Sequence, residues 1–169
     1  WRPEHLSCYS LIVEDGTLFG ELYAQGRLQL PGDDDELAMY EFTIKFLGDR
    51  GYDHYEISNW ALPGRESRHN RIYWLNGDWL GLAPGAHGQW QGVRFANVRL
   101  PDDYARLTAA GQRPVASSEL VDVRTAQEDT VILGLRLREG VDADVFLQRF
   151  GVAIPDVFGA EIQRVLELG

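Results

Sequence analysis

Residues that can bind a metal, pair with acids or stack on a flat ligand are concentrated in one short stretch of the chain. Residues 69–74 read HNRIYW, which places a histidine close to two aromatic side chains. Three arginines, Arg65, Arg68 and Arg71, flank His69, although the whole chain carries a net charge of −10. Loops on a rigid scaffold commonly carry function, so this stretch predicts a ligand surface. The alternative is an ordinary surface loop that leads into a hairpin.

A second stretch is rich in glycine. Residues 81–88 read GLAPGAHG, and glycine is used where a backbone must approach another group closely. That group is either a ligand or another part of the chain, as in a bulge that bends a hairpin. The pattern alone slightly favours the bend.

Composition narrows the class of protein. At 169 residues, the chain is long enough for one domain with a real core. Its net charge of −10 disfavours contact with a nucleic-acid backbone, which needs clustered lysine and arginine. No apolar run approaches the roughly 20 residues that span a bilayer, and no basic, apolar leader is visible. A single cysteine, Cys8, excludes an intrachain disulfide and is compatible with a reducing cytosol, so we expect a cytoplasmic protein.

Several short motifs together resemble one protein family. They are YEISNWA at residues 55–61, Pro63-Gly64, HN-x-x-YW at 69–74, and Gly81 with GAHG at 85–88. This set is similar to radical SAM proteins related to oxygen-independent coproporphyrinogen III oxidase. The HN-x-x-YW element is closer to the heme-chaperone branch of that family than to the oxidases. The resemblance covers about residues 6–150 and is specific over its middle third, but the family's Cys-x3-Cys-x2-Cys motif is absent.

The elements that carry these motifs predict an α/β fold. Residues 6–13 form an apolar run typical of a buried parallel strand. Residues 34–47 follow an acidic start and carry one apolar stripe, which predicts a helix. With a strand at 52–57 they form a βαβ unit, whose two strands we expect to be parallel neighbours. By resemblance, residues 1–62 are the last part of an incomplete (β/α)6 barrel.

After the barrel part we expect an antiparallel meander over residues 63–100. Asn76-Gly77 predicts a hairpin between strands at 72–75 and 79–82, and Gln91-Gly92 predicts a further turn. A mostly helical region over 101–169 completes the three-part division. Its expected helices cover residues 101–111, 126–137 (with a capping box from Thr125 to Glu128), 142–150 and 155–168.

The family resemblance gives the HN-x-x-YW stretch a ligand. A neutral imidazole of His69 can bind heme iron axially, and arginine guanidinium groups can pair with heme propionates. Aromatic rings can cover a porphyrin face. The candidate heme-binding residues are Arg65, Arg68, His69, Arg71, Tyr73 and Trp74, with Trp60 as a further ring. The alternative is that His69 bonds a carbonyl while the aromatic residues form core, and the sequence leaves both open.

Other candidate sites are weaker. Alignment to the oxidases places Ile12 and His87 near residues that line S-adenosylmethionine. Glu14, Asp53 and Glu56 could be paired carboxylates for glycoside hydrolysis. We do not favour that role, because no spacing rule sets their separation and the resemblance gives them none.

The resemblance implies a parent protein of heme or porphyrin metabolism, with S-adenosylmethionine and a 4Fe–4S cluster as its cofactors. Because the chain begins with Trp1 rather than Met and stops in a helical pattern, we expect a fragment that lacks the cluster cysteines and any catalytic residue. Its expected partners are heme or porphyrin, heme-accepting proteins, and a second copy at an exposed barrel edge. The alternative function is an inactive substrate-binding or structural module that completes the barrel wall.

The cysteine count yields the first prediction. A 4Fe–4S cluster of this family needs three cysteine ligands, and the chain has only Cys8. Anaerobic reconstitution with iron and sulfide is therefore expected to leave no stoichiometric cluster on the chain. Iron and sulfide analysis with EPR checks this. A stoichiometric cluster signal would contradict it, unless Cys8 thiolates of several chains shared one cluster.

Overall fold

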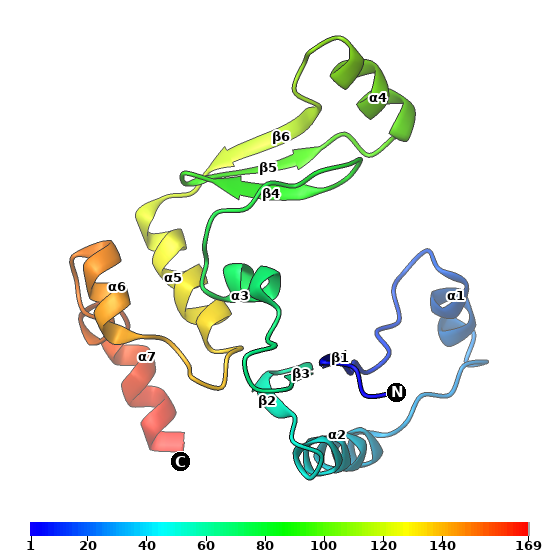
Figure 1. Ribbon diagram of the computed structural model, residues 1–169, viewed down its shortest axis with the longest axis vertical. Coiled ribbons are helices and arrows are strands. Elements are labelled where there is room, and N and C mark those ends of the chain that lie inside the picture. The colour runs from blue at the N-terminus through cyan, green and yellow to red at the C-terminus, as the bar shows by residue number, and fades with distance from the viewer. Residues whose placement is uncertain (169) are drawn as a thin grey trace. The chain divides into compact units, whose positions relative to one another are not determined.

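The computed structural model describes residues 1–168 and divides the chain into two units, Trp1–Ser67 and Arg68–Gly169 (Figure 1). Gly169 lies outside the described residues. The boundary falls just before the HN-x-x-YW motif, so the YEISNWA motif belongs to the first unit and HN-x-x-YW to the second. The finer three-part division stays a prediction.

The first unit contains a three-stranded antiparallel sheet and two helices. Its elements are β1 (His5–Ser7), α1 (Leu18–Ala24), α2 (Asp33–Gly48), β2 (Asp53–Glu56) and β3 (Asn59–Ala61). The strand order is β1-β3-β2, and β3 pairs antiparallel with both neighbours. The sheet therefore has β1 and β2 at its edges.

The expected pair of neighbouring parallel strands is wrong. β1 and β2 run in the same direction, but β3 lies between them because the chain turns back directly after β2. The apolar run at 6–13 forms strand structure only as far as Ser7. Beyond it, Cys8 keeps one backbone bond, from its N–H to the Ser58 carbonyl (2.9 Å). A buried strand needs hydrogen-bonding neighbours along its length, and residues 9–13 have none in this unit.

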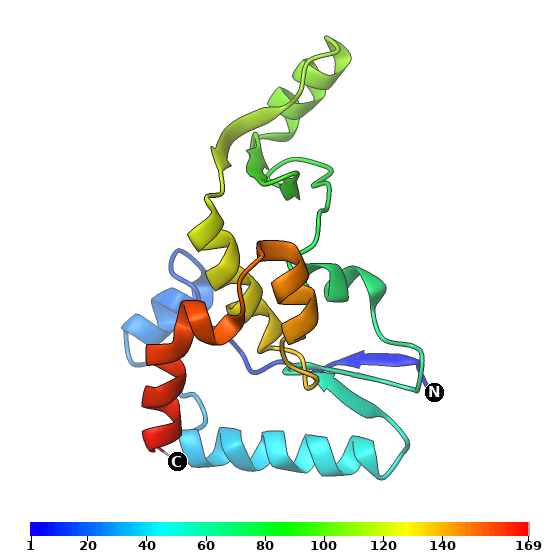
Figure 2. The same ribbon diagram turned by 90° about the vertical axis from the view of Figure 1, so that its left-hand side faces the viewer.

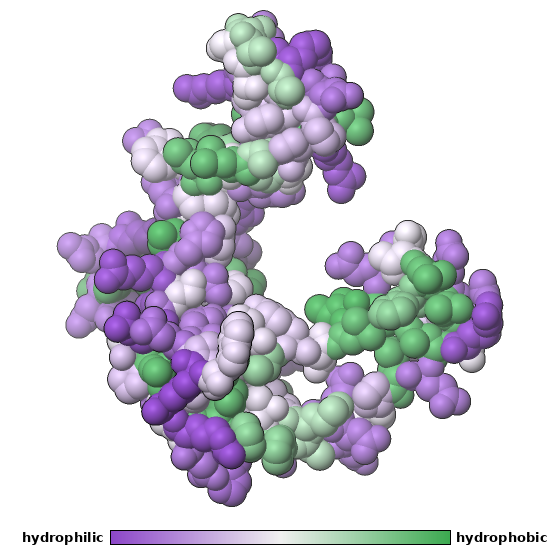
Figure 3. All heavy atoms as spheres, turned by 45° about the vertical axis from the view of Figure 1, so that its right-hand side comes forward, coloured by the Kyte–Doolittle hydropathy of each residue, from purple (hydrophilic) through white to green (hydrophobic). Residues whose placement is uncertain are grey.

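Apolar side chains in that part of the first unit are consequently exposed. Figure 3 shows hydrophobic surface gathered over the segment that contains α1. The exposed residues there are Tyr9, Leu11, Ile12, Leu18, Phe19 and Tyr23. The sequence did not predict α1, a short helix capped by the Thr17 hydroxyl, which accepts from the Gly20 N–H (3.0 Å).

The helix expected at 34–47 is confirmed as α2. Four acidic residues occupy its first turn, where they complement the positive end of the helix dipole. Its last turns pack Leu47 into a small core with Tyr52 and Trp60. The residues that predict this helix lie within it, so the prediction does not depend on how the neighbouring strands pair.

The YEISNWA motif forms the centre of the first unit. Trp60 is 0% exposed, and the His54 ring stacks on it with centroids 4.4 Å apart. The buried Glu56 carboxylate accepts hydrogen bonds from the Asn59 amide and from the Ser58 N–H (2.9 Å). These contacts close the turn between β2 and β3, so the motif has a packing role.

The second unit combines another antiparallel sheet with five helices among its described residues (Figure 2). Its elements are α3 (Arg68–Trp74), β4 (His87–Trp90), β5 (Val93–Asn97), α4 (Pro101–Ala109), β6 (Val115–Leu120), α5 (Val123–Gly134), α6 (Ala143–Phe150) and α7 (Ile154–Leu168). The sheet order is β4-β5-β6 with antiparallel pairs throughout. Phe146 of α6 is buried against Phe150 (4.7 Å between centroids) and Phe158 of α7 (6.4 Å).

The hairpin expected around Asn76-Gly77 is wrong, because the residues before it form α3. Asn76 has a left-handed φ of 50°. Its N–H donates to the Tyr73 carbonyl (2.9 Å), and the Gly77 N–H donates to the Ile72 carbonyl (2.8 Å). This is a Schellman helix end. Asn in the left-handed conformation is common both in hairpin turns and at helix ends. The Asn-Gly dipeptide therefore could not distinguish the two structures.

Of the expected meander, the strands at 72–75 and 79–82 are wrong, but the turn at Gln91-Gly92 and the antiparallel pair that it joins are confirmed. Gln91 and Gly92, both with positive φ, connect β4 to β5. β6 was not predicted, because its sequence VASSEL, exposed in the structure, lacks the alternation typical of a half-buried strand. The helices expected near 101–111, 142–150 and 155–168 are present as α4, α6 and α7.

The expected capping box at Thr125 is wrong in position. Helix α5 begins earlier, with Asp122 as its N-cap. The Asp122 carboxylate accepts from the Thr125 N–H (2.9 Å) and from its hydroxyl (3.1 Å), and these bonds lower the pKa of Asp122. Asp and Thr are both good caps, so the sequence offered two starting points for this helix.

One buried side chain joins the elements of the second unit. The Asn76 amide nitrogen donates to the Thr130 hydroxyl (3.0 Å) and the Ala126 carbonyl (3.3 Å) of α5. Its oxygen accepts from the Gln89 amide of β4 (2.9 Å). Arg149 of α6 donates to the Asn76 carbonyl (2.9 Å). The end of α3 is thereby tied to a strand and two helices.

Two general features concern the whole described chain. None of its helices within residues 1–168 combines the length and apolar character required to cross a membrane. Across the same residues, the structure gathers no three histidine, cysteine or acidic side chains into a group that could hold a metal ion.

The Asn76 network yields the second prediction. Replacing Asn76 by Ala leaves its buried hydrogen-bond partners unsatisfied. It also puts alanine, whose side chain cannot form a local hydrogen bond, at a positive φ. We therefore expect the free energy of unfolding to fall by about 2–4 kcal/mol. The matched control is Gln91→Ala, which shares the φ of 50° at an exposed turn and is expected to cost about 1 kcal/mol or less. Urea unfolding measures both. Equal losses would show that backbone strain, and not the buried network, is the important term.

Candidate functional site

His69 and Tyr73 form a hydrogen-bonded pair on one face of α3. The Tyr73 hydroxyl lies 2.7 Å from His69 Nε2, and the ring centroids are 4.8 Å apart at an angle of 74°. The two residues are one helical turn apart, which is the spacing at which helix side chains meet. His69 is exposed and Tyr73 is half-buried. The pair therefore presents an imidazole and a phenol together to solvent.

Trp79 extends this pair towards the sheet. Its ring meets Tyr73 edge to face, with centroids 4.8 Å apart and an angle of 87°. Backbone bonds to Gln89 (2.8 and 3.0 Å) hold Trp79 beside β4. Its indole N–H donates to the His87 carbonyl (3.3 Å). The result is a row of rings, His69–Tyr73–Trp79, which we call the aromatic row.

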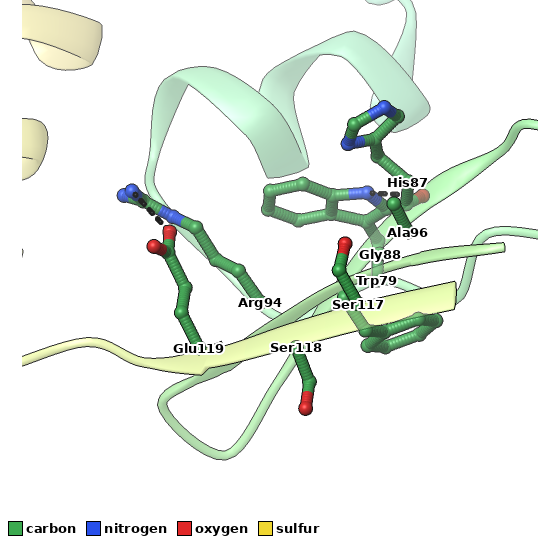
Figure 4. Close-up of a pocket in the computed structure, with 9 residues that line it drawn as sticks. Trp79, His87, Gly88, Arg94, Ala96, Ser117, Ser118 and Glu119 are labelled. Atoms are coloured by element: carbon green, nitrogen blue, oxygen red, sulfur yellow. Dashed lines mark hydrogen bonds and ion pairs between the residues drawn. The ribbon is translucent and has the colours of Figure 1, made fainter. Parts of the chain in front are cut away.

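The sheet end of the aromatic row opens onto a hollow of about 400 Å³ (Figure 4). Figure 4 shows the Trp79 indole between the side chains of Arg94 and His87. The remaining lining residues come from the sheet: Gly88, Phe95, Ala96, Ser117, Ser118 and Glu119. Arg94 already forms ion pairs with the Asp129 and Glu119 carboxylates, and its Nε–H donates to the side-chain amide oxygen of Gln89 (3.3 Å). Its charge is therefore largely neutralised within the protein.

The glycines of the second stretch allow close approaches within the chain itself. A Cβ at Gly88 would overlap the Phe95 ring, and one at Gly81 would overlap the His87 carbonyl. Gly85 has a φ of +69°, a conformation that favours glycine. The expected bend of the meander accounts for these positions.

The other members of the candidate heme set lie elsewhere on α3. The Arg136 guanidinium lies over the Trp74 ring, 4.3 Å from its centroid. Arg71 forms an ion pair with Glu139 (2.6 Å). Helical geometry puts Trp74 well away from His69 around the axis, so the two aromatic residues of the motif serve different faces.

The two remaining arginines of the candidate heme set lie in different units. Arg65 belongs to the first unit, where it pairs with Glu4 at 3.4 Å. Arg68 begins α3, is exposed, and forms no ion pair within residues 1–168. Trp60, considered as a further porphyrin-covering ring, is fully buried in the first unit, so that role is wrong.

The residues proposed to line S-adenosylmethionine lie in different units. Ile12, 78% exposed, lines a shallow hollow of the first unit with Glu14 and the start of α1. His87 is exposed in the second unit. The structure gives no evidence for a glycosidase pair, since Glu56 is fully buried and bonded to Asn59 while Asp53 and Glu14 are exposed. Burial raises the pKa of the Cys8 thiol, which suits a packing residue.

Sequence reasoning missed Trp79 as a site residue. A signal for the His69–Tyr73 pair is present, because the two residues have helical spacing. Trp79 offers no such signal, since its contact with Tyr73 exists only once α3 ends at Asn76 and the chain returns along β4.

Comparison with known proteins shows what the chain is similar to. The HemN C-terminal domain matches residues 121–169. The chain is 36% identical to the heme chaperone HemW of Lactococcus lactis over 96% of this chain and 42% of the relative. It is 37% identical to HemW of Bacillus subtilis over 98% and 44%. The radical S-adenosyl methionine domain-containing protein 1 of Mus musculus, a mitochondrial protein, is 34% identical over 98% and 40%.

The solved structure of coproporphyrinogen III oxidase (HemN) from Escherichia coli, described as a radical SAM enzyme, matches with a TM-score of 0.71. Its sequence is 18% identical to this one, and the match covers 99% of this chain and 41% of the HemN chain. Nearly the whole of this chain is therefore similar in sequence to part of the HemW heme chaperones. Its α/β fold matches that of HemN. It spans about two-fifths of the length of these relatives.

The packing around the hollow yields the third prediction. Gly88→Ala must displace the Phe95 ring, and overpacking of this kind typically costs about 1–3 kcal/mol. Gly159→Ala is the matched control in α7, where the added methyl meets open space and is expected to be neutral or to stabilise by up to about 1 kcal/mol. Urea unfolding followed by tryptophan fluorescence compares them. Equal midpoints for both variants would contradict the close approach.

Proposed function

We propose that α3 carries a heme-binding surface of a HemW-like heme chaperone, centred on exposed His69 and half-buried Tyr73. The observation that carries this proposal is the pair itself, an imidazole and a phenol 2.7 Å apart on an accessible helix face. Both groups are known types of axial heme ligand. The relatives named heme chaperones cover the whole of this segment.

The surroundings of the pair suit a flat, anionic ligand. Tyr73 and Trp79 supply ring surface for a porphyrin. Arg68, which has no acidic partner in the described chain, is available to a propionate. Because the chain is otherwise strongly acidic, a local cation matters more for attracting an anion.

The other motif residues have a supporting role in this proposal. Arg71 and Trp74 hold the opposite side of α3 through Glu139 and Arg136. They thereby orient the face that bears His69. Arg65 belongs to the first unit and stays a candidate propionate partner from the sequence alone.

The chain is proposed to act within a radical SAM protein that uses S-adenosylmethionine and a 4Fe–4S cluster. The names of the mouse and E. coli relatives support this. Cys8 alone cannot supply three cluster ligands, and Ile12 and His87 remain candidate neighbours of S-adenosylmethionine. The first unit would form the last part of an incomplete barrel, and the edges of its sheet at β1 and β2 are places where a second copy could pair.

A structural module is the second candidate function. The largely buried YEISNWA hairpin favours it for the first unit, since its Glu56 and Asn59 side chains are buried and turned to each other, not to a ligand. In that case heme handling would be confined to the second unit.

A heme titration yields the fourth prediction. His69→Ala is expected to weaken heme binding about tenfold or more, since an iron-bonding pair is broken. Arg68→Ala should weaken it about fivefold, as expected from roughly 1 kcal/mol for a partly exposed ion pair. His5→Ala is the control, because it removes an imidazole of the first unit, where His5 lies 2.8 Å from the Tyr55 hydroxyl. Absorbance titration measures the affinities, and equal values for wild type and all variants would contradict the proposal.

A further inference from the structure

The hydrogen bond within the pair restricts which atom can reach iron. Nε2 is the imidazole nitrogen that projects furthest from the backbone, and in this structure it lies 2.7 Å from the Tyr73 oxygen. A neutral imidazole has one nitrogen that accepts and one that donates. When Nε2 accepts the phenol proton, its lone pair is occupied and is not directed at an incoming ligand. The phenol oxygen, in contrast, keeps its lone pairs.

The surrounding contacts hold the phenol in place. One turn of α3 separates the two residues, so the helix backbone sets their spacing. The Tyr73 ring is fixed edge to face between His69 and Trp79, with centroids 4.8 Å away on both sides. His69 lies at the exposed end of the row and Tyr73 is half-buried. The phenol is therefore held between two rings, with its oxygen within hydrogen-bond distance of an imidazole nitrogen.

We propose that Tyr73 is the residue that binds ferric heme iron on this surface and that His69 acts as its hydrogen-bonded base. This inference rests on the proposed heme-binding function and assigns the ligand within it. An anionic phenolate oxygen is a hard ligand that suits iron(III), and tyrosine is an established axial ligand of ferric heme in catalase.

The binding step balances without any electron transfer. The Tyr73 O–H bond breaks and its proton moves along the hydrogen bond to His69 Nε2. The phenolate oxygen forms a bond to iron(III), and a water molecule or other weak ligand leaves the iron. The product is an iron–phenolate bond beside an imidazolium, which donates its Nε2 proton back towards the bound oxygen. His69 therefore stabilises the ligand that it deprotonated.

Tyr73 and His69 have different roles in this proposal, so variants of the two residues are expected to give different spectra. Ferric heme is titrated into the chain and into Tyr73→Phe and His69→Ala, with absorbance for affinity and resonance Raman and EPR for the ligand. Wild type is expected to show a high-spin ferric heme with iron–phenolate vibrations. Tyr73→Phe should lose those vibrations and bind at least tenfold more weakly. His69→Ala should keep them while also binding more weakly, because its phenol lacks a base.

A control variant and a folding measurement distinguish loss of the iron ligand from loss of the folded unit. Tyr104→Phe removes one phenol oxygen elsewhere in the same unit, where Tyr104 accepts from the Ala83 N–H (3.1 Å), and should leave the heme spectrum unchanged. Thermal unfolding of each variant confirms that the unit is folded. An unchanged spectrum in Tyr73→Phe with a lost spectrum in His69→Ala would overturn the tyrosine assignment and leave the heme surface standing. Unchanged spectra and affinities in both would overturn the heme surface as well.

Discussion

The side-chain amide of Asn76 is the contact on which the second unit depends. A helix as short as α3 is marginal on its own, so its position must come from its ends and its packed face. Asn76 ends the helix in a left-handed conformation and bonds α5 and β4 through the same amide. Without those bonds, the face that carries His69 and Tyr73 would have no defined direction.

The same helix shows how one motif can serve two purposes. Trp74 lies under Arg136 and anchors α3 on its packed side, while Tyr73 joins His69 and Trp79 on the exposed side. Adjacent residues on a helix point about 100° apart, so neighbours in sequence are separated in space. A motif that reads as one chemical cluster along the chain is therefore divided between support and binding.

The first unit makes a related point about recognition. YEISNWA is among the motifs that most clearly mark the resemblance, yet Glu56, Asn59 and Trp60 are fully buried, and the Asn59 amide donates to the Glu56 carboxylate. A carboxylate out of water needs partners close by, which explains why specific polar residues appear in a tight turn. Such a motif identifies a fold, whereas the exposed HN-x-x-YW stretch is the part that can meet a ligand.

The sequence by itself determined the features whose causes are local. The acidic start of α2, Pro101 at the start of α4, Gly151 at the end of α6 and the Gln91-Gly92 turn all act within a few residues, and the structure agrees with each. The family resemblance also came from short motifs. Tertiary structure decided the rest, because the deciding partner lies far along the chain. Asn76-Gly77 became a helix end through α5 and β4, β3 came between β1 and β2, and Trp79 reached Tyr73 only through its pairing with Gln89.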